Sequence, residues 1–91
     1  MLRIRDLIFD ERNQEHIARH HVNTDEVEEV CWSLPLVRRG RYGRLAVYGQ
    51  TLVGRYLLVV LAPRAGGDYY VITARPMTQA ESRRYRHQKR R

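Results

Sequence analysis

The stretch RYLLVVLAPRAGGDYYVITAR, residues 55–75, decides the fold of this 91-residue chain. It contains two apolar runs, 56–62 and 69–74, with the length and the Leu, Val, Ile and Tyr content of β-strands. The letters between them, APRAGGD, carry the Pro, Gly and Asp residues that are typical of a loop. The sequence therefore predicts a β-hairpin at the centre of a small sheet, with Arg55 and Arg75 adjacent at its open end.

Further strands are predicted on both sides of this hairpin. Residues 36–44 and 44–51, LVRRGRYGR and RLAVYGQT, indicate two strands around a turn at Gly43. Residues 3–9, RIRDLIF, can form a short edge strand. Because short connections join the four strands from residue 36 onward, we expect these strands to be mainly antiparallel.

Two helices are predicted between the edge strand and the other strands. Asp10 is a suitable N-cap for a helix over residues 10–21. Asn23 and Glu26 resemble a capping box for a second helix, which Pro35 ends. The apolar residues of this second helix predict a buried stripe. They are Val27, Val30, Cys31 and Leu34.

A last helix is predicted at the C-terminus. Thr78 and Glu81 form a T-x-x-E capping box at its start. The helix is polar nearly all round, so we expect contact with the sheet through Ala80 and Tyr85 at most. Its end, RHQKRR, is expected to fray.

The order of these elements predicts an α+β fold. A small antiparallel sheet of about four or five strands is joined to two N-terminal helices and one C-terminal helix. No repeat or linker divides the chain, so residues 1–91 are expected to form a single domain.

Composition narrows the class of protein. With 43% hydrophobic residues, the chain is typical of a globular protein. No apolar run approaches the roughly 18 residues of a membrane span, and the N-terminus lacks the apolar segment of a signal peptide. The lone cysteine, Cys31, excludes an internal disulfide and suits a reducing compartment. We therefore expect a cytoplasmic protein of a bacterium, with no membrane association.

Charge is distributed unevenly along the chain. The net charge is +7, and all basic residues except Lys89 are arginine. Residues 1–33 hold four arginines and eight acidic residues, whereas residues 34–91 hold 13 basic and two acidic residues. This asymmetry favours a polyanion such as nucleic acid as partner of the second half. The alternative is that the proteome as a whole is rich in arginine, so that the surface arginines of this chain reflect a general bias in composition and no function.

The histidines and the cysteine suggest a zinc site only weakly. His16 and His20 are four residues apart, but there is no H-E-x-x-H motif and no second cysteine or carboxylate at ligand spacing. Surface histidines on an amphipathic helix explain the pattern better. Cys31 falls within the apolar stripe, which indicates a buried structural thiol rather than a nucleophile. We therefore expect no metal and no cofactor.

The arginines at the strand ends suggest a phosphate site. Arg55 and Arg75 could hold a phosphodiester, with Arg44 and Arg38 or Arg39 on neighbouring strands. A histidine from the first helix could act as acid or base near neutral pH. The alternative for each arginine is a solvated strand end or an ion pair with a helix carboxylate, such as Glu15 or Glu29. Composition alone leaves both interpretations open.

Two further residue types have structural as well as functional interpretations. The position of Glu81 in the capping box explains it without catalysis. Tyrosines could stack RNA bases on a sheet face, although tyrosine also suits strands without any function. They are Tyr42, Tyr48, Tyr56, Tyr69 and Tyr70.

Three segments together resemble the BrnT toxin family. IFDERNQEHIARHHV at residues 8–22 is similar to the opening motif of that family. GRYLLVVLAP and GGDYYVITARPMTQAESRRY, at residues 54–63 and 66–85, are similar to its closing motif of an apolar strand, a strand ending in I-[ST]-A-R, and a capped helix. The resemblance covers roughly residues 8–86.

This resemblance implies a compact RelE-like fold and a metal-independent ribonuclease toxin of a type II toxin–antitoxin pair. It implies a cognate antitoxin that is a small DNA-binding protein. Two positions depart from the family pattern: Phe9 replaces a tryptophan, and residues 19–22, RHHV, replace Lys-His-Gly-Val. The matching positions are Asp10, His20, Arg55, Arg75 and Glu81.

The leading hypothesis is an endoribonuclease in which Arg55 and Arg75 bind the scissile phosphate. His20 is expected to act as acid or base or to position the substrate, and Glu81 and Tyr85 are secondary candidates. Additional RNA contacts are expected from Arg38, Arg44, Tyr48 and Tyr85. The partners are RNA and an antitoxin, in a homodimer or a toxin–antitoxin hetero-oligomer. The alternative is a non-catalytic basic protein that binds nucleic acid or belongs to a repressor complex.

Overall fold

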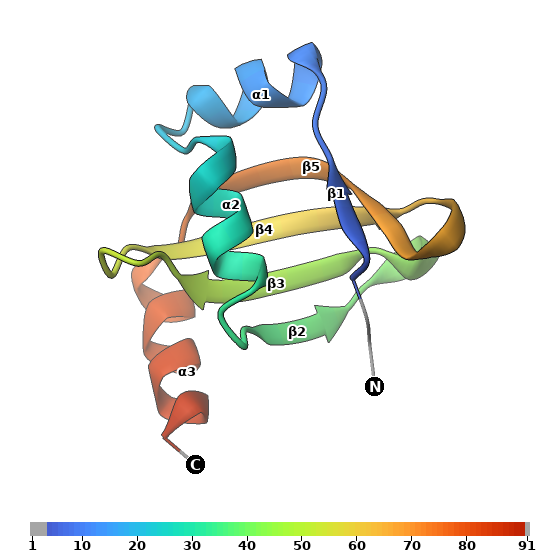
Figure 1. Ribbon diagram of the computed structural model, residues 1–91. Helices are drawn as coiled ribbons and strands as arrows, with labels where there is room; N and C mark the ends of the chain where they lie inside the picture. Colours follow the sequence, from blue (N-terminus) through green and yellow to red (C-terminus); the bar gives the residue numbers. More distant parts are fainter. Residues whose placement is uncertain (1–3, 91) are drawn as a thin grey trace.

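A five-stranded sheet forms the middle of the computed structural model, which describes residues 4–90 (Figure 1). The strand order is β1-β5-β4-β3-β2, and β1 is the one strand that pairs in parallel, with β5; the other pairs are antiparallel. The fold is thus α+β with a mixed sheet. The strands are β1 Asp6–Ile8, β2 Leu36–Arg39, β3 Leu45–Gln50, β4 Tyr56–Pro63 and β5 Asp68–Pro76.

Three helices complete the fold, two before β2 and one after β5. They are α1 Glu11–Ala18, α2 Thr24–Cys31 and α3 Gln79–Lys89. Each begins with the capping box that the sequence predicts or with a closely related one. Asp10, Asn23 and Thr78 accept a hydrogen bond from the third helical residue, whose side chain accepts one in return. These reciprocal bonds explain why each helix begins where it does.

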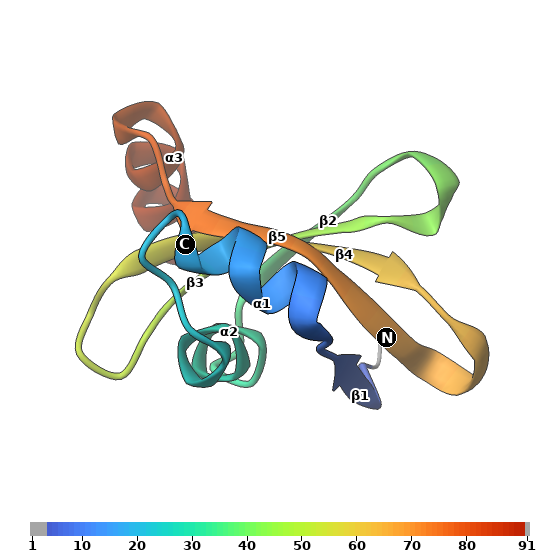
Figure 2. The ribbon, with the colours of Figure 1, turned by 90° about the horizontal axis from the view of Figure 1, so that it is seen from above.

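The helices lie on opposite sides of the sheet. Figure 2 shows α1 and α2 on one side and α3 on the other, at one end of the strands. The core lies beneath α1 and α2, because side chains alternate along a strand and every second residue points to these helices. It includes Leu57, Val59 and Leu61 of β4, each fully buried. We call this side the helix face and the opposite side the open face.

An irregularity in β5 sets which of its residues lie on the open face. Leu61 pairs with Val71 and Val60 pairs with Thr73, so Ile72 is an extra residue in the β5 strand. The extra residue keeps both Val71 and Ala74 buried on the helix face. Thr73 and Arg75 therefore lie on the open face, beside Val60 and Leu58 of β4.

Several predictions about element ends were wrong. Helix α1 stops at Ala18 and α2 at Cys31, so Leu34 lies beyond the helix and is 83% exposed rather than buried. The strand predicted over residues 36–44 ends at Arg39, and a 3-10 turn at Arg41–Gly43 follows it. Residues 1–3 and 91 of the predicted terminal elements lie outside the described residues.

Helix α3 also differs from its prediction in two respects. Its contact with the sheet is through Tyr85, which is buried, whereas Ala80 is exposed. The helix continues to Lys89 instead of fraying, and Lys89 Nζ donates a 2.8 Å hydrogen bond to the carbonyl of Leu34. This bond ties the end of α3 to the segment that follows α2.

Candidate nucleic-acid interface on the open face

The cross-strand register arranges the side chains of the open face in rows. One row runs through Leu36, Tyr48, Leu58 and Arg75, which are direct partners on β2, β3, β4 and β5. The next row runs through Arg38, Ala46, Val60 and Thr73. Small and aliphatic residues thus form the middle of this face, and arginines stand at its two edges.

Arg75 is held in place by Glu81 at the start of α3. Its Nη1 and Nη2 donate to the two carboxylate oxygens of Glu81 at 2.8 and 2.9 Å, a bidentate ion pair. Glu81 also accepts a 2.8 Å bond from the backbone N–H of Thr78, as the capping box requires. The Arg75 hydrogen bonds lower the pKa of Glu81 to about 2, and the same contact raises the pKa of Arg75.

This pKa decides what Glu81 can do. A carboxyl group with a pKa of about 2 is a very weak base at neutral pH, since a general base works best when its pKa lies near the operating pH. Glu81 therefore acts as a capping and positioning residue. The side chain of Arg75 remains 34% exposed, so solvent still reaches its guanidinium.

The start of α3 brings the predicted RNA-contacting residues together beside this pair. Arg38, Tyr48, Glu81, Arg84 and Tyr85, with Leu36, line one recess. Its volume is only about 10 Å³, roughly enough for one water molecule. A nucleotide would have to lie over this surface and not inside it.

Tyr85 serves packing more than recognition. It is 6% exposed, and its ring meets that of Tyr56 edge-on at 5.9 Å between centroids. Burial raises the pKa of its hydroxyl group. Tyr85 thus anchors α3 to the sheet and leaves little ring surface on which a base could stack, whereas Tyr48 is half-buried and Arg44, at the far end of β3, is exposed.

Arg55 lies apart from Arg75, contrary to the expectation that the two are adjacent. Its Nη1 donates to Glu26 Oε2 of α2 at 2.7 Å and to the His21 carbonyl at 2.8 Å. Both acceptors belong to the helix face, whereas Arg75 contacts α3 on the open face. Arg55 therefore fixes the α1–α2 connection to the sheet, and its partners differ from that of Arg75.

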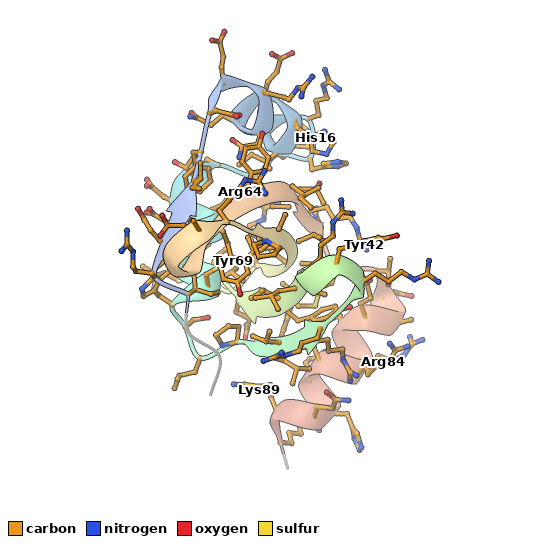
Figure 3. The ribbon with its side chains drawn as sticks, turned by 90° about the vertical axis from the view of Figure 1, so that its right-hand side faces the viewer. His16, Tyr42, Arg64, Tyr69, Arg84 and Lys89 are labelled. Atoms are coloured by element: carbon orange, nitrogen blue, oxygen red, sulfur yellow. The ribbon has the colours of Figure 1, made fainter. Side chains whose placement is uncertain are left out.

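His16 of α1 contacts the sheet, whereas the predicted His20 packs against the ring of His16. His16 Nε2 is 3.0 Å from Thr73 Oγ1, and the ring of His20 meets that of His16 at 5.5 Å between centroids. Figure 3 shows His16 at α1, above β5 at the edge of the sheet, and Arg84 on α3. Because Thr73 and Arg75 are two residues apart on one strand face, roughly 7 Å separates their positions.

His16 was predicted as a possible metal ligand together with His20, and as one of the first-helix histidines that could act as acid or base. Thr73 was not singled out, although it belongs to the I-T-A-R segment that ends in Arg75. The strand alternation of that segment was the signal that places Thr73 and Arg75 on one face. The pairing of Thr73 with His16 depends on where α1 packs, which no local pattern indicates.

A groove opens beside His16, between α1 and β5. It has a volume of about 730 Å³ and includes Arg12, Arg19, Tyr70 and Ile72 among its lining residues. The hydroxyl of Tyr70 donates to the carboxylate of Asp10 at 3.0 Å, and Arg64 lies over its ring at 5.0 Å from the centroid. Glu11 and Glu15 also line the groove, so it places charges of both signs and an aromatic ring next to the His16–Thr73 contact.

Cysteine and metal chemistry have little support in the described part of the chain. Burial is the main cause that raises the pKa of Cys31 to about 12, so its thiol stays protonated at neutral pH. Across residues 4–90, no three His, Cys, Asp or Glu side chains are grouped as metal ligands would be. No helix within these residues is long and apolar enough to cross a membrane.

The open face thus combines a bidentate Arg75–Glu81 pair, further arginines on β2 and α3, and a His16–Thr73 contact at the edge of β5. Arginines with nearby imidazole groups can bind a phosphodiester and transfer protons to and from it. Comparisons of this chain with models of protein families, with curated proteins and with solved structures find no match.

Proposed function

We propose that this chain is a metal-independent endoribonuclease toxin of the BrnT type, with RNA bound on the open face. The observation that carries the proposal is the placement of Arg75 and the His16–Thr73 contact on the same side of β5. The similarity of residues 8–22, 54–63 and 66–85 to the BrnT motifs supports the same function. The strongly basic C-terminal half is a further argument for a polyanionic substrate.

The proposed reaction needs only proton transfer and charge stabilisation. A base removes the proton of the RNA 2′-hydroxyl, and the oxygen attacks the adjacent phosphorus. The bond from phosphorus to the 5′ oxygen breaks, and an acid protonates that oxygen. The products are a 2′,3′-cyclic phosphate and a free 5′-hydroxyl group, and no oxidant or other reactant is consumed.

Each residue of the site has a role in this scheme. Arg75, aligned by Glu81, stabilises the negative charge that develops on the phosphate. His16 transfers the proton, and His20 packs against it and supports its orientation. Arg38 and Arg84 bind neighbouring phosphates. Arg55, through Glu26 and the His21 carbonyl, positions the segment that carries His20.

The test is cleavage of a single-stranded RNA by the purified protein in the presence of a metal chelator. We expect discrete fragments with cyclic phosphate ends from the wild type, and a loss of at least about 100-fold in rate for Arg75→Ala and for His16→Ala. Arg38→Ala removes one of the proposed contacts with a neighbouring phosphate. Its matched control is Arg39→Ala, because Arg39 is the next residue of β2 and its partner is Leu45 on the helix face. Wild-type activity in Arg75→Ala would refute the proposal.

A non-catalytic role in nucleic-acid binding is the second candidate. The observation that favours it is the neutralisation of Arg75 by Glu81 and of Arg55 by Glu26. Such a protein would bind RNA or DNA with a steep salt dependence and leave it intact. Binding that Arg38→Ala weakens more than Arg39→Ala, without any cleavage, would decide for this role.

The proposed biology follows from the BrnT resemblance. The protein would act in the cytoplasm of a bacterium and be silenced by a cognate antitoxin, a small DNA-binding protein. Expression of the wild type should arrest growth, and Arg75→Ala should not. An unchanged arrest by a folded Arg75→Ala protein would contradict the toxin assignment.

A further inference from the structure

Four large apolar side chains are exposed where α2 ends and where β3 turns into β4. They are Trp32 at 56%, Leu34 at 83%, Leu52 at 86% and Val53 at 85% exposure. We call these four residues the apolar patch. Exposed apolar side chains that gather on one part of a monomer often mark an interaction site. Among the described residues only one further large hydrophobic side chain, Tyr42, is comparably exposed, and it lies in the β2–β3 connection.

Hydrogen bonds bring the two segments of the apolar patch together. Glu29 Oε1 of α2 accepts a 2.9 Å bond from the backbone N–H of Leu52, so the β3–β4 turn lies against the helix. Trp32 is three residues after Glu29 and therefore on the same side of α2. Leu34 follows two residues later and marks the border of this surface, because its carbonyl accepts from Lys89 Nζ of α3, on the other side of the sheet. Figure 1 shows the turn projecting beyond the sheet beside α2.

The β3–β4 turn presents its apolar side chains on a fixed backbone. The backbone N–H of Thr51 donates to the Arg55 carbonyl, and that of Gly54 donates to the Thr51 carbonyl, at 3.0 and 2.9 Å. Thr51 Oγ1 also accepts a 3.0 Å bond from the N–H of Arg55. Leu52 and Val53 stand at the tip of this closed turn, where polar residues are usual. A rigid apolar tip loses little conformational entropy on binding.

The charge around the apolar patch indicates what can cover it. Helix α2 carries four acidic residues and no basic residue. Glu26 is paired with Arg55, whereas residues 4–90 provide no ion pair for Asp25, Glu28 or Glu29. A symmetric dimer through this surface would bring two acidic helices together, which like-charge repulsion opposes. A basic partner would instead complement these charges.

We propose that the apolar patch and the acidic side of α2 form a docking surface for another protein, which presents an amphipathic helix with apolar residues on one side and Lys or Arg on the flanks. This is the binding mode in which the apolar face of a helix covers exposed hydrophobic side chains while its charges pair at the rim. The surface lies on the helix-face side of the sheet. The inference does not depend on the activity proposed for the open face.

A synthetic helix can test this chemistry directly. The probe is a peptide of about 18 residues with Leu on one side and Lys on the other, long enough to be helical. The control peptide has Glu in place of Lys. Trp32 is the only tryptophan of the chain, so its fluorescence reports contact at the patch. We expect a blue shift and a Kd of about 10 µM with the Lys peptide, weakening as salt rises, and no shift with the Glu peptide.

Variants establish whether the patch carries the binding. Leu52→Ser combined with Val53→Ser should weaken it at least about tenfold, and Asp25→Asn with Glu28→Gln should weaken it about fivefold. All four positions are exposed, so the variants keep their fold, and Tyr42→Ser is the matched control with no effect. Equal binding of both peptides, or unchanged binding by the Leu52 and Val53 variant, would overturn the proposal. So would a wild-type dimer that this double variant converts to a monomer, since a second copy would then occupy the patch.

Discussion

Replacement of Glu81 by glutamine tests the contribution of the Arg75–Glu81 pair to stability. Glutamine keeps the shape and an amide oxygen that can accept from the backbone N–H of Thr78, so the capping box survives. The substitution therefore removes the charge and leaves the helix start intact. Its effect can be measured as the free energy of unfolding in urea, for both proteins over a range of pH.

The magnitude follows from the pKa of Glu81, which the native state lowers from 4.5 to about 2. A shift of this size corresponds to at most roughly 3 kcal/mol. The two side chains are 19% and 34% exposed, and solvent screening reduces the value. We expect Glu81→Gln to destabilise the protein by about 1–2 kcal/mol at pH 7. For a domain of this size that lowers Tm by about 5–15 °C.

The sign of the pH dependence follows from the lowered pKa. Because the folded-state pKa lies below the unfolded value, the carboxylate stabilises the fold fully above about pH 4.5, and this stabilisation is lost as pH falls towards 2. The difference between wild type and Glu81→Gln should therefore be constant from pH 6 to 8 and vanish near pH 2. Other carboxylates titrate in both proteins, so their effects cancel in the difference.

A second glutamate provides the control for the helix dipole. Glu11 lies in the first turn of α1, is exposed, and forms no ion pair within residues 4–90. Glu11→Gln should cost no more than about 0.5 kcal/mol, the usual effect of a charge near a helix N-terminus. If Glu81→Gln costs no more than this control, or if its cost does not change with pH, the ion pair does not stabilise α3 as argued.

Three further substitutions or reactions test the packing around the site. Asn13→Ala should lower the free energy of unfolding, measured in urea, by about 2–4 kcal/mol. The buried Asn13 amide donates to the carbonyls of Ile8 and Val71, each at 3.0 Å, and the change leaves both carbonyls unpaired. Gly49→Ala should cost about 1–2 kcal/mol, since the added Cβ lies 3.1 Å from Val30 Cγ1, whereas Gly40→Ala meets no atom closer than 3.7 Å and should be nearly neutral; equal costs would contradict this packing. Burial raises the pKa of the Cys31 thiol to about 12. The thiol should therefore react with a disulfide reagent at pH 8 at least about 100-fold more slowly in the native protein than in the urea-unfolded protein. An equal rate would show that the thiol is accessible in the native protein.

Element types could be predicted from sequence because local signals agree with the tertiary fold. The runs at 56–62 and 69–74 are apolar enough to be recognised as buried strands, and they form β4 and β5. Capping residues placed the helix starts, since the capping interaction is made within four residues of chain. Helix ends were harder. His21 and Leu34 adopt left-handed backbone conformations with φ near 60° without being glycine, so the usual sequence signal of a helix stop is missing.

The geometry of the candidate site could be predicted only in part. Leu58 pairs with Arg75, and Arg55 precedes Leu58 by three residues. An odd separation along a strand reverses the side on which a side chain lies, which is consistent with the contact of Arg55 with α2 rather than α3. The pairing itself depends on the loop between the strands and on the extra residue Ile72, and composition does not reveal either. His20 was expected from the BrnT resemblance, whereas the contact of His16 with Thr73 joins segments 57 residues apart and is not indicated by any local pattern.

The two ion pairs beside the sheet explain how one small chain keeps two surfaces of opposite charge. Glu26 neutralises Arg55 on the helix face, and Glu81 neutralises Arg75 on the open face. Negative charge then remains on the helix face at Asp25, Glu28 and Glu29, and positive charge remains on the open face at Arg38 and Arg84. The sheet, with fully buried side chains such as Val59, separates the two surfaces. A polyanion on the open face and a basic helix on α2 would therefore bind without competing for the same residues, so charge changes at Asp25 and Glu28 should leave RNA binding nearly unchanged while Arg38→Ala should leave peptide binding unchanged.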